Sequence, residues 1–595
     1  MKLTPLAKAL ITMIVIGAVG LGVYSQRQKL FPDKKAQPSS VPPKVELSSG
    51  SSAGTAAPPK VVVDAKPGCA DKPEVRLYHW AWNAQMGLMY ATGGKQAAEG
   101  SLMCKHGANL KLVREDDTNN MQSQLAAFAE ELKGGKANPE KGAHFIIIMG
   151  DGGAQFFKAM NDRLGKLGQE YEAEIVGVAG FSRGEDKFMG PQQWKDNPQS
   201  ARGGLVAGVL RDGDWNIAMK WLGDNNIPNN PDERSYDPDA LNWVNANDYI
   251  EAATKYITGF CVDMKNKKTG AKDKHCVQGI VTWTPGDVNA AEQKGGIVSI
   301  VSTKEYRSQM PAIIIGNKKW INANRDTVKG MLAAIFEGGD AVKNDPAALQ
   351  KAAAVSAIAY GEKDADYWLK YFTPQLVNDK QGISVDLGGS AVSNLADNMN
   401  TFGLAPGSSN LLAATYTTFG NVVRSQYPDL VPRFPPITSV LDVSFVKELD
   451  GETATKSPAD IAKFDPAKKA KPADVVVSRK NWDIKFDSGK ATFTGAAEGQ
   501  LKTLLNDLVI ASGTTVEIHG HTDNQGNAEA NMKLSEDRAF AVQAWLEKAS
   551  PANFPEGRIK VFAHGQTNPL TSNSTPGGQA KNRRVEIVLG ASERS

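Results

Sequence analysis

The stretch from Val516 to Val588 restricts the folds open to this chain more than any other. It opens on VEIHG, in which apolar and polar residues alternate, and this pattern predicts a half-buried strand. A Gly-His-Thr-Asp loop follows, and Asn531, with Glu536 and Asp537 after it, predicts the cap and first turn of a helix. We therefore expect a strand and a helix joined by a polar loop.

The predicted helix carries an arginine inside its apolar face. Leu534, Val542 and Trp545 share one face, and Arg538 lies four residues from both Leu534 and Val542. A guanidinium removed from water needs an anionic partner, and Asp523 at the end of the preceding strand is the nearest candidate in the sequence. Two interpretations stay open here. Arg538 either pairs or snorkels for purely structural reasons, or it holds a zwitterionic ligand together with Asp523.

A series of short motifs in this region resembles the OmpA-like peptidoglycan-binding domain, over roughly residues 480–590. The matching residues are Gly520-His521-Thr522-Asp523, Asn531, Leu534-Ser535, Arg538-Ala539, Gly565 and Asn582-Arg583-Arg584-Val585-Glu586-Ile587. The spacing agrees as well, with 15 residues from Asp523 to Arg538 and eight from Asp523 to Asn531. The resemblance implies an α+β domain that binds peptidoglycan.

The resemblance also implies a role for individual residues. Asp523 and Arg538 would hold the ammonium and carboxylate ends of diaminopimelate in the stem peptide, which suits one fixed acid and one forked base. Asn531 would assist from the start of the helix, although capping alone could account for it. Arg583 and Arg584 are expected to brace the fold rather than touch the ligand.

The middle of the chain alternates between strand and helix patterns. Strand-like segments occur at 75–80, 110–113, 144–149 and 205–210, and helical segments at 121–132, 155–164 and 214–222. This alternation predicts an α/β fold with mainly parallel sheets. The order of segments, with Trp80-Ala81-Trp82, Arg114–Met121, Arg211–Trp215 and Val281–Pro285 after strands, resembles a two-lobed periplasmic solute-binding protein of the nitrate, sulfonate or phosphate transporter type, over about residues 74–445.

A two-lobed fold would place a solute at the carboxyl ends of strands. Trp82 and Trp283 each follow a predicted strand and could stack on a solute, or could equally be packed core residues. Ser182 could donate to an anion, although such turns are more often plain surface loops. The glycine-rich turn 150–153 could hold an anion but more often forms a tight turn, and it is not a dinucleotide fingerprint. We expect a small, anionic solute.

An apolar run from Ala9 to Tyr24 follows Lys2 and Lys8. It is either a signal peptide cut after Ser25 or an uncleaved anchor over residues 6–26. Both interpretations export the remaining chain to the periplasm, and the anchor would hold it at the inner membrane.

Composition places the predicted domain boundaries. A leader or anchor over 1–30 is followed by a disordered Pro/Ser/Ala-rich linker over 31–65 and the solute-binding-like domain over 66–449. A lysine-rich flexible linker covers 450–478, and the OmpA-like domain covers 479–595.

Four cysteines are too few for a disulfide scaffold in a chain of 595 residues. Cys69 and Cys104 are 35 residues apart and Cys261 and Cys276 are 15 apart, so two local bridges are the simplest of the three possible pairings. There is no Cys-x-x-Cys pair, which argues against zinc or thioredoxin-type chemistry. An even number of cysteines fits an oxidising compartment.

Charge and motifs exclude several functions. The net charge is only +3, so nothing calls for a nucleic-acid partner. The sequence holds neither Gly-x-Ser-x-Gly nor His-Glu-x-x-His, and His519 and His521 lack a third ligand, so we expect no enzyme, metal or cofactor.

Taken together, the sequence predicts an envelope protein that binds peptidoglycan and carries a solute-binding domain for uptake or sensing, with a membrane transporter or envelope complex as a possible partner. In the alternative, the middle domain is a ligand-free spacer or docking module.

Overall fold

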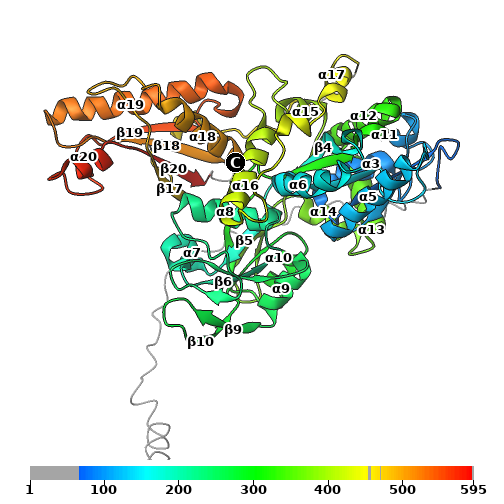
Figure 1. Cartoon of the computed structure of the whole chain (residues 1–595), viewed down its shortest axis with the longest axis horizontal. Coiled ribbons are helices and arrows are strands. Elements are labelled where there is room, and N and C mark those ends of the chain that lie inside the picture. Colours follow the sequence, from blue (N-terminus) through cyan, green and yellow to red (C-terminus); the bar gives the residue numbers. More distant parts are fainter. Residues whose placement is uncertain (1–65, 453–456, 469–470, 592–595) are drawn as a thin grey trace, which may run out of the picture. The chain divides into compact units, whose positions relative to one another are not determined.

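The computed structural model describes residues 66–452, 457–468 and 471–591 (Figure 1). The predicted leader or anchor and the predicted linker over 31–65 lie outside these residues. Among the described helices, none combines the length and apolar character needed to cross a bilayer. The chain divides into a unit over Met1–Lys60 and a unit over Val61–Ser595, and everything below concerns the second.

The first lobe is built on a six-stranded sheet in the order β16-β4-β13-β3-β1-β2. Its strands are β1 (Glu74–His79), β2 (Asn109–Arg114), β3 (Phe145–Met149), β4 (Ala173–Ser182), β13 (Pro311–Asn317) and β16 (Ser390–Val392). β1 is parallel to β2 and β3, while β13 is antiparallel to β3 and β4, so four strands run in one direction. Every residue of β3 is buried, as its continuous apolar sequence predicts.

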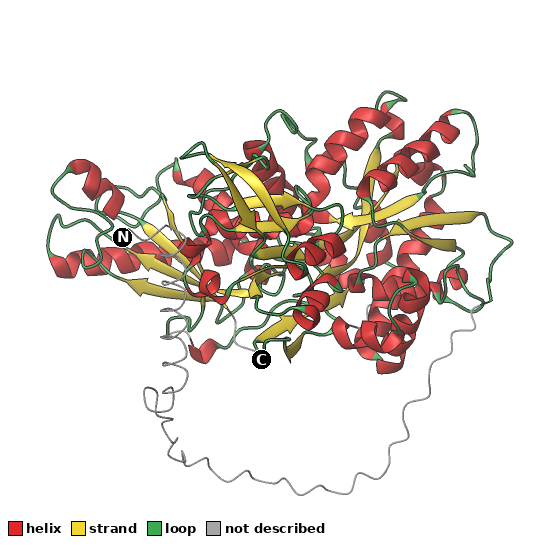
Figure 2. Cartoon of the chain, turned by 90° about the horizontal axis from the view of Figure 1, so that it is seen from below, coloured by secondary structure: helices red, strands yellow, loops and turns green. Residues whose placement is uncertain are grey.

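Helices flank this sheet (Figure 2). They are α3 (Met86–Thr92), α5 (Thr118–Lys133), α6 (Gly153–Leu164), α11 (Lys318–Ala323), α12 (Arg325–Asn344), α13 (Pro346–Tyr360), α14 (Ala365–Phe372), α15 (Leu395–Thr401), α16 (Leu411–Gln426) and α17 (Ser444–Asp450). The disulfide between Cys69 and Cys104 joins the start of the lobe to α4 (Leu102–Lys105), which confirms the first predicted bridge.

The second lobe is built on a five-stranded sheet in the order β12-β5-β11-β6-β8. Its strands are β5 (Lys187–Gly190), β6 (Leu205–Gly208), β8 (Asn242–Asn245), β11 (Gly279–Thr282) and β12 (Val298–Ser302). β6 is parallel to β8 and β11, and only β5 runs against its neighbours. This sheet is accompanied by α7 (Gln192–Asp196), α8 (Gly213–Asp224), α9 (Tyr249–Ile257) and α10 (Gly286–Gln293). The topology of the two sheets confirms the predicted α/β fold.

Two small antiparallel pairs extend the second lobe. β9 (Cys261–Asn266) pairs with β10 (Lys272–Cys276), and the disulfide between Cys261 and Cys276 closes this hairpin, which confirms the second predicted bridge. β14 (Gln375–Asn378) pairs with β15 (Ser384–Leu387).

Several segments connect the two lobes, and three adjacent ones we call the crossovers: residues 183–186 from β4 to β5, 303–310 from β12 to β13, and 388–389 from β15 to β16. The first donates to the third, from the backbone N–H groups of Arg183 and Glu185 to the carbonyl of Gly389, both at 2.9 Å. The hydroxyls of Ser182 and Thr303 lie 2.6 Å apart and join the first to the second. Hydrogen bonds therefore bind the crossovers into one strap between the lobes.

The C-terminal domain holds a four-stranded sheet in the order β17-β20-β18-β19. Its elements are β17 (Val476–Trp482), α18 (Ala497–Ile510), β18 (Thr514–Gly520), α19 (Ala528–Ala549), β19 (Ile559–Ala563), α20 (Pro576–Asn582) and β20 (Val585–Ala591). The predicted strand, loop and helix are β18, residues 521–527 and α19. The predicted cap at Asn531 is wrong, because the side chain of Asn527 accepts from the N–H groups of the first turn.

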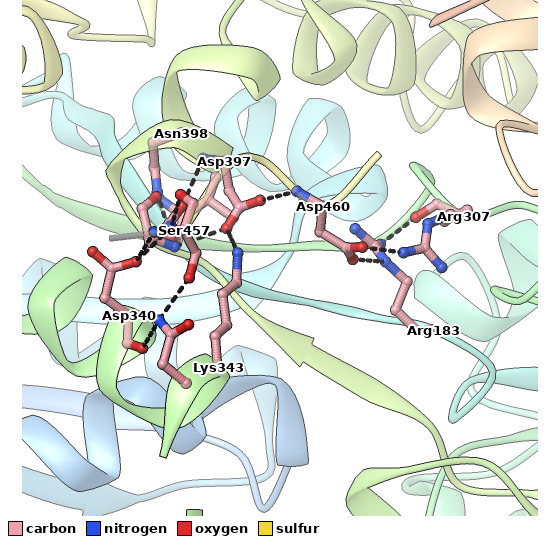
Figure 3. A network of polar contacts seen from close by, with 11 residues as sticks. Arg183, Arg307, Asp340, Lys343, Asp397, Asn398, Ser457 and Asp460 are labelled. Carbon is pink, nitrogen blue, oxygen red and sulfur yellow. Dashed lines mark hydrogen bonds and ion pairs between the residues drawn. The ribbon is translucent and has the colours of Figure 1, made fainter. Parts of the chain in front are cut away.

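Residues 457–468, inside the predicted flexible linker, are placed against the first lobe and the crossovers (Figure 3). The carboxylate of Asp460 pairs with Arg183 at 3.2 Å and with Arg307 at 2.5 Å, while its backbone N–H donates to Asp397 at 2.7 Å. Arg183 and Arg307 belong to two different crossovers. Lysine and proline content predicted a flexible linker here. Composition does not show that one acid, Asp460, forms two ion pairs that hold the segment.

Candidate functional site

A cavity of about 680 Å³ opens in the C-terminal domain where the end of β18 faces α19 and α20. Asp523, Asn531 and Arg538 all line it, so the structure brings the three predicted peptidoglycan-site residues together. His521, Phe486 and the backbone around Gly489 also contribute to its wall. This volume lies in the ordinary range for a small-molecule pocket.

Asp523 is held rigidly at the end of β18. Its Oδ1 accepts from the backbone N–H of Gln525 at 3.0 Å, and its Oδ2 accepts from Nη1 of Arg583 at 2.5 Å. The preceding loop is fixed as well, because the N–H of Thr522 donates to the carbonyl of Gly565 at 2.8 Å. The carboxylate is therefore buried, held by these partners and placed in the wall of the cavity.

Arg538 lies on α19, and its side chain is 7% exposed. Its Nε donates to the carbonyl of Lys490 at 3.0 Å, and its guanidinium lies over the ring of Phe486, 5.1 Å from the centroid. No carboxylate among the described residues forms an ion pair with it. Burial lowers the pKa of Arg538, nearby Arg583 lowers it further, and Asp523 only partly offsets both. The guanidinium thus has unfilled capacity for an anion.

Asn531 organises the loop that carries Asp523. Its Nδ2 donates to the carbonyl of Gln525 at 2.9 Å and to Oε1 of Gln566 at 3.0 Å. The side chain therefore ties the first turn of α19 to two loops at the rim of the cavity. Helix geometry explains this position, since Asn531 lies one turn beyond the true cap and faces inward.

Arg583 and Arg584 both line the cavity but differ in their partners. Arg584 donates from Nε to Oδ1 of Asn481 at 3.0 Å and so connects β20 to β17, which suits the bracing role expected of it. Arg583 instead pairs with Asp523 and remains partly exposed. Sequence reasoning did not place Arg583 at the site. Arg583 and Arg584 are adjacent in the family motif, and the motif does not show which of the two side chains reaches Asp523.

A second cavity, of about 380 Å³, lies at the carboxyl ends of strands from both sheets of the middle domain. It is lined by residues that follow β1, β2 and β3 in the first lobe and β6, β8 and β11 in the second. We call it the cleft. Trp80 and Trp283 form part of its wall, and Trp283 stacks on Tyr249 with ring centroids 4.0 Å apart.

The three predicted solute-binding residues are not brought together. Trp283 lines the cleft, but Trp82 and Ser182 are fully buried and are not among the cleft residues. Ser182 is engaged in the strap between the lobes, where its Oγ accepts from the N–H of Asp186 at 3.0 Å. The glycine-rich turn 150–153 opens α6 and buries Asp151 behind the cleft.

Comparison with known proteins identifies the C-terminal part. Residues 485–583 match the OmpA family model. Outer membrane porin F of Pseudomonas fluorescens is 36% identical over 115 residues, 19% of this chain and 34% of that protein. Peptidoglycan-binding protein ArfA of Mycobacterium tuberculosis is 37% identical over 106 residues, 18% of this chain and 32% of that protein. This chain thus spans about a third of the length of these relatives, and the predicted OmpA-like domain is confirmed.

Several solved structures align with more than 60% of this chain. The periplasmic nitrate-binding protein NrtA from Synechocystis PCC 6803 aligns with 67% of this chain and 97% of that chain, at 9% identity and a TM-score of 0.44. The two-lobed fold is defined by the two sheets and the crossovers between them.

Proposed function

We propose that this chain is a binding protein of the periplasm that attaches to peptidoglycan through its OmpA-like domain and takes a small solute between the lobes of its middle domain. One observation carries the first part: Arg538 is buried beside the cavity without an ion-pair partner among the described residues, and Asp523 lines the same cavity. A ligand with both an ammonium and a carboxylate, such as the diaminopimelate of a stem peptide, matches this pair of charges.

The geometry assigns a part to each group. Arg538 receives the carboxylate on its two free nitrogens while Nε stays on the carbonyl of Lys490. Asp523 receives the ammonium on the face that Arg583 leaves open, and Asn531 keeps the loop in place. These contacts are all non-covalent, so they account for binding of the wall.

The relatives support this proposal, because one of them is named a peptidoglycan-binding protein and the match covers the site residues. For the middle domain, the cleft at the carboxyl ends of strands from both lobes supports solute binding over a ligand-free spacer. Uptake or sensing of that solute, and a transporter or envelope complex as its partner, complete the proposal.

The test for wall binding is sedimentation of the full chain with purified sacculi. A variant with Asp523→Ala and Arg538→Ala is expected to remain in the supernatant under conditions in which the unchanged protein pellets. Lys533→Ala on the same helix is the matched control, since Lys533 is exposed and pairs only with Glu536 and Asp537. Pelleting of the double variant at the level of the control would overturn the proposal.

A further inference from the structure

Four buried carboxyls gather behind the cleft, at the level of the strap between the lobes. Asp151 follows β3, Glu185 and Asp186 belong to the first crossover, and Asp214 begins α8 after β6. Their side chains are at most 5% exposed. Asp212 continues the group to the wall of the cleft itself. Acids from both lobes and from the crossover between them therefore converge at one place.

Each of these carboxyls has at least one oxygen without a hydrogen bond within the described part of the chain, although the other oxygen of Asp151 accepts from Nε2 of Gln309 at 2.8 Å and the other oxygen of Glu185 accepts from the hydroxyl of Ser390. Oxygens of all four have no partner among the described residues: Oδ1 of Asp151, Oε1 of Glu185, both oxygens of Asp186 and Oδ1 of Asp214. The hydroxyl of Ser182, the carboxyl of Asp214 and the indole N–H of Trp82 lie near enough to Asp186 to change its pKa, yet none of them meets the geometry of a hydrogen bond to its carboxyl oxygens. Buried polar atoms ordinarily form hydrogen bonds. Carboxyl oxygens without one, buried behind the cleft, therefore indicate that a ligand supplies the donor.

The cations of this region are already engaged. Lys187 is fully buried and pairs with Asp287 at 2.5 Å. Arg211 at the cleft pairs with Glu233 at 2.6 Å. The two arginines of the crossovers bind Asp460. Because each has its own acid, only Lys187 offsets part of the charge, at Asp186, and none of these cations is free to receive an anion there.

The pKa values of the four buried carboxyls agree with this shortage of positive charge. Burial raises the pKa of Asp186 to about 6. Burial, followed by repulsion from Asp186, raises the pKa of Asp214 and of Glu185 well above the ordinary value. Burial likewise raises the pKa of Asp151. The pKa values of these buried acids are raised because little positive charge lies near them. A bound cation would therefore stabilise their ionised form.

We propose that the cleft takes a small organic cation, with a solute ammonium or guanidinium that contacts Asp212 at the wall and is attracted by the buried carboxyls of Asp186 and Asp214 behind it, in place of the anion expected from the sequence. This inference rests on the proposed solute-binding function. The cleft wall supports it, since Asp117 and Asp248 line it beside the indole rings of Trp80 and Trp283, whereas Asp116 in the same wall pairs with Arg114 at 2.7 Å. Carboxylates with aromatic faces are the usual surroundings of a bound organic cation.

A metal ion fits less well. Among the described residues, no three His, Cys, Asp or Glu side chains are arranged to hold one. An organic cation instead fills a volume of 380 Å³ and spreads its donors over several acceptors.

The test is isothermal titration calorimetry of the full chain with four probes: agmatine and choline as cations, nitrate and methanesulfonate as anions. At least one cation is expected to bind and neither anion to do so. Asp186→Asn and Asp214→Asn should each weaken that binding at least tenfold. Asp196→Asn, an exposed acid on α7 of the second lobe, is the control and should change it less than twofold.

The outcomes separate the inference from the function on which it rests. Binding of an anion without a cation overturns the inference and leaves the solute-binding function standing. Binding of neither class overturns both, while the sacculus assay still decides wall attachment. Cation binding that both variants retain would also overturn the inference. Each Asn variant is isosteric and removes a buried carboxyl, so its melting temperature should hold or rise, and thermal melting checks this directly.

Discussion

Arg538→Met separates a ligand-binding guanidinium from a structural one, because the two roles predict opposite outcomes. If Arg538 braced the fold through a buried ion pair, its loss would cost about 3–5 kcal/mol of stability. The structure gives it one hydrogen bond, to the carbonyl of Lys490, whose net worth is about 0.5–1.5 kcal/mol. Removing an unpaired buried charge offsets that loss. The unfolding free energy should therefore change by less than about 1 kcal/mol.

Binding should respond far more strongly than stability. A charge-assisted hydrogen bond to a ligand carboxylate is worth about 1.5–3 kcal/mol, so affinity for a diaminopimelate-containing stem peptide should fall roughly 10- to 100-fold. Titration with that peptide measures affinity, and hydrogen exchange of the β18 amides in the full chain measures local stability. Arg584→Met is the control, because Arg584 shares the cavity but bonds to Asn481 and to the carbonyl of Asn568.

The reasoning is refuted if Arg538→Met loses 3 kcal/mol or more in β18 while the peptide binds as before. Such a result would return Arg538 to the structural interpretation that the helix pattern alone left open.

Three further predictions concern stability. Asp460→Ala should make residues 457–468 accessible to limited proteolysis. Burial would raise the pKa of Asp460, but its two arginines lower that pKa below the ordinary value. The stability that Asp460 contributes should therefore be present above about pH 4 and be lost as the pH falls and the carboxylate is protonated. Arg558→Met should lower the free energy of opening measured by hydrogen exchange at the β18 amides by about 3 kcal/mol or more, because Arg558 donates to four buried backbone carbonyls. Unchanged protection of these amides would contradict this. Replacing Cys261 and Cys276 by Ala should lower stability by about 3 kcal/mol in denaturant titration, from the loop entropy of their bridge.

Periodicity and motif order predicted most of the fold. The apolar run before Gly150 could only be a buried strand, and the alternating segments around it gave the class of both lobes. The start of α19 was misplaced because Asn527 and Asn531 are both acceptable caps, and local sequence does not say which one precedes the first helical turn.

The sites were predictable to different degrees. The roles of Asp523 and Arg538 followed from the resemblance to the OmpA-like domain, because the charge and spacing of the two residues alone left a structural role for Arg538 open. The buried acids of the middle domain do not share a motif: Asp151, Asp186 and Asp214 are distant in sequence, and only the two sheets and the crossovers bring them together. Their burial, and hence the sign of charge that the cleft prefers, depends on contacts that no local pattern encodes.

The bonds of Asp460 to two crossovers have a mechanical consequence. A rotation of one lobe against the other must bend those crossovers, and it must then either carry residues 457–468 along or break both ion pairs. Those residues lead directly into the domain that would grip the cell wall. Tension on the wall-bound end would reach the crossovers through these ion pairs, and also directly through the hydrogen bond from the N–H of Ser308 to the carbonyl of Ile510 in α18.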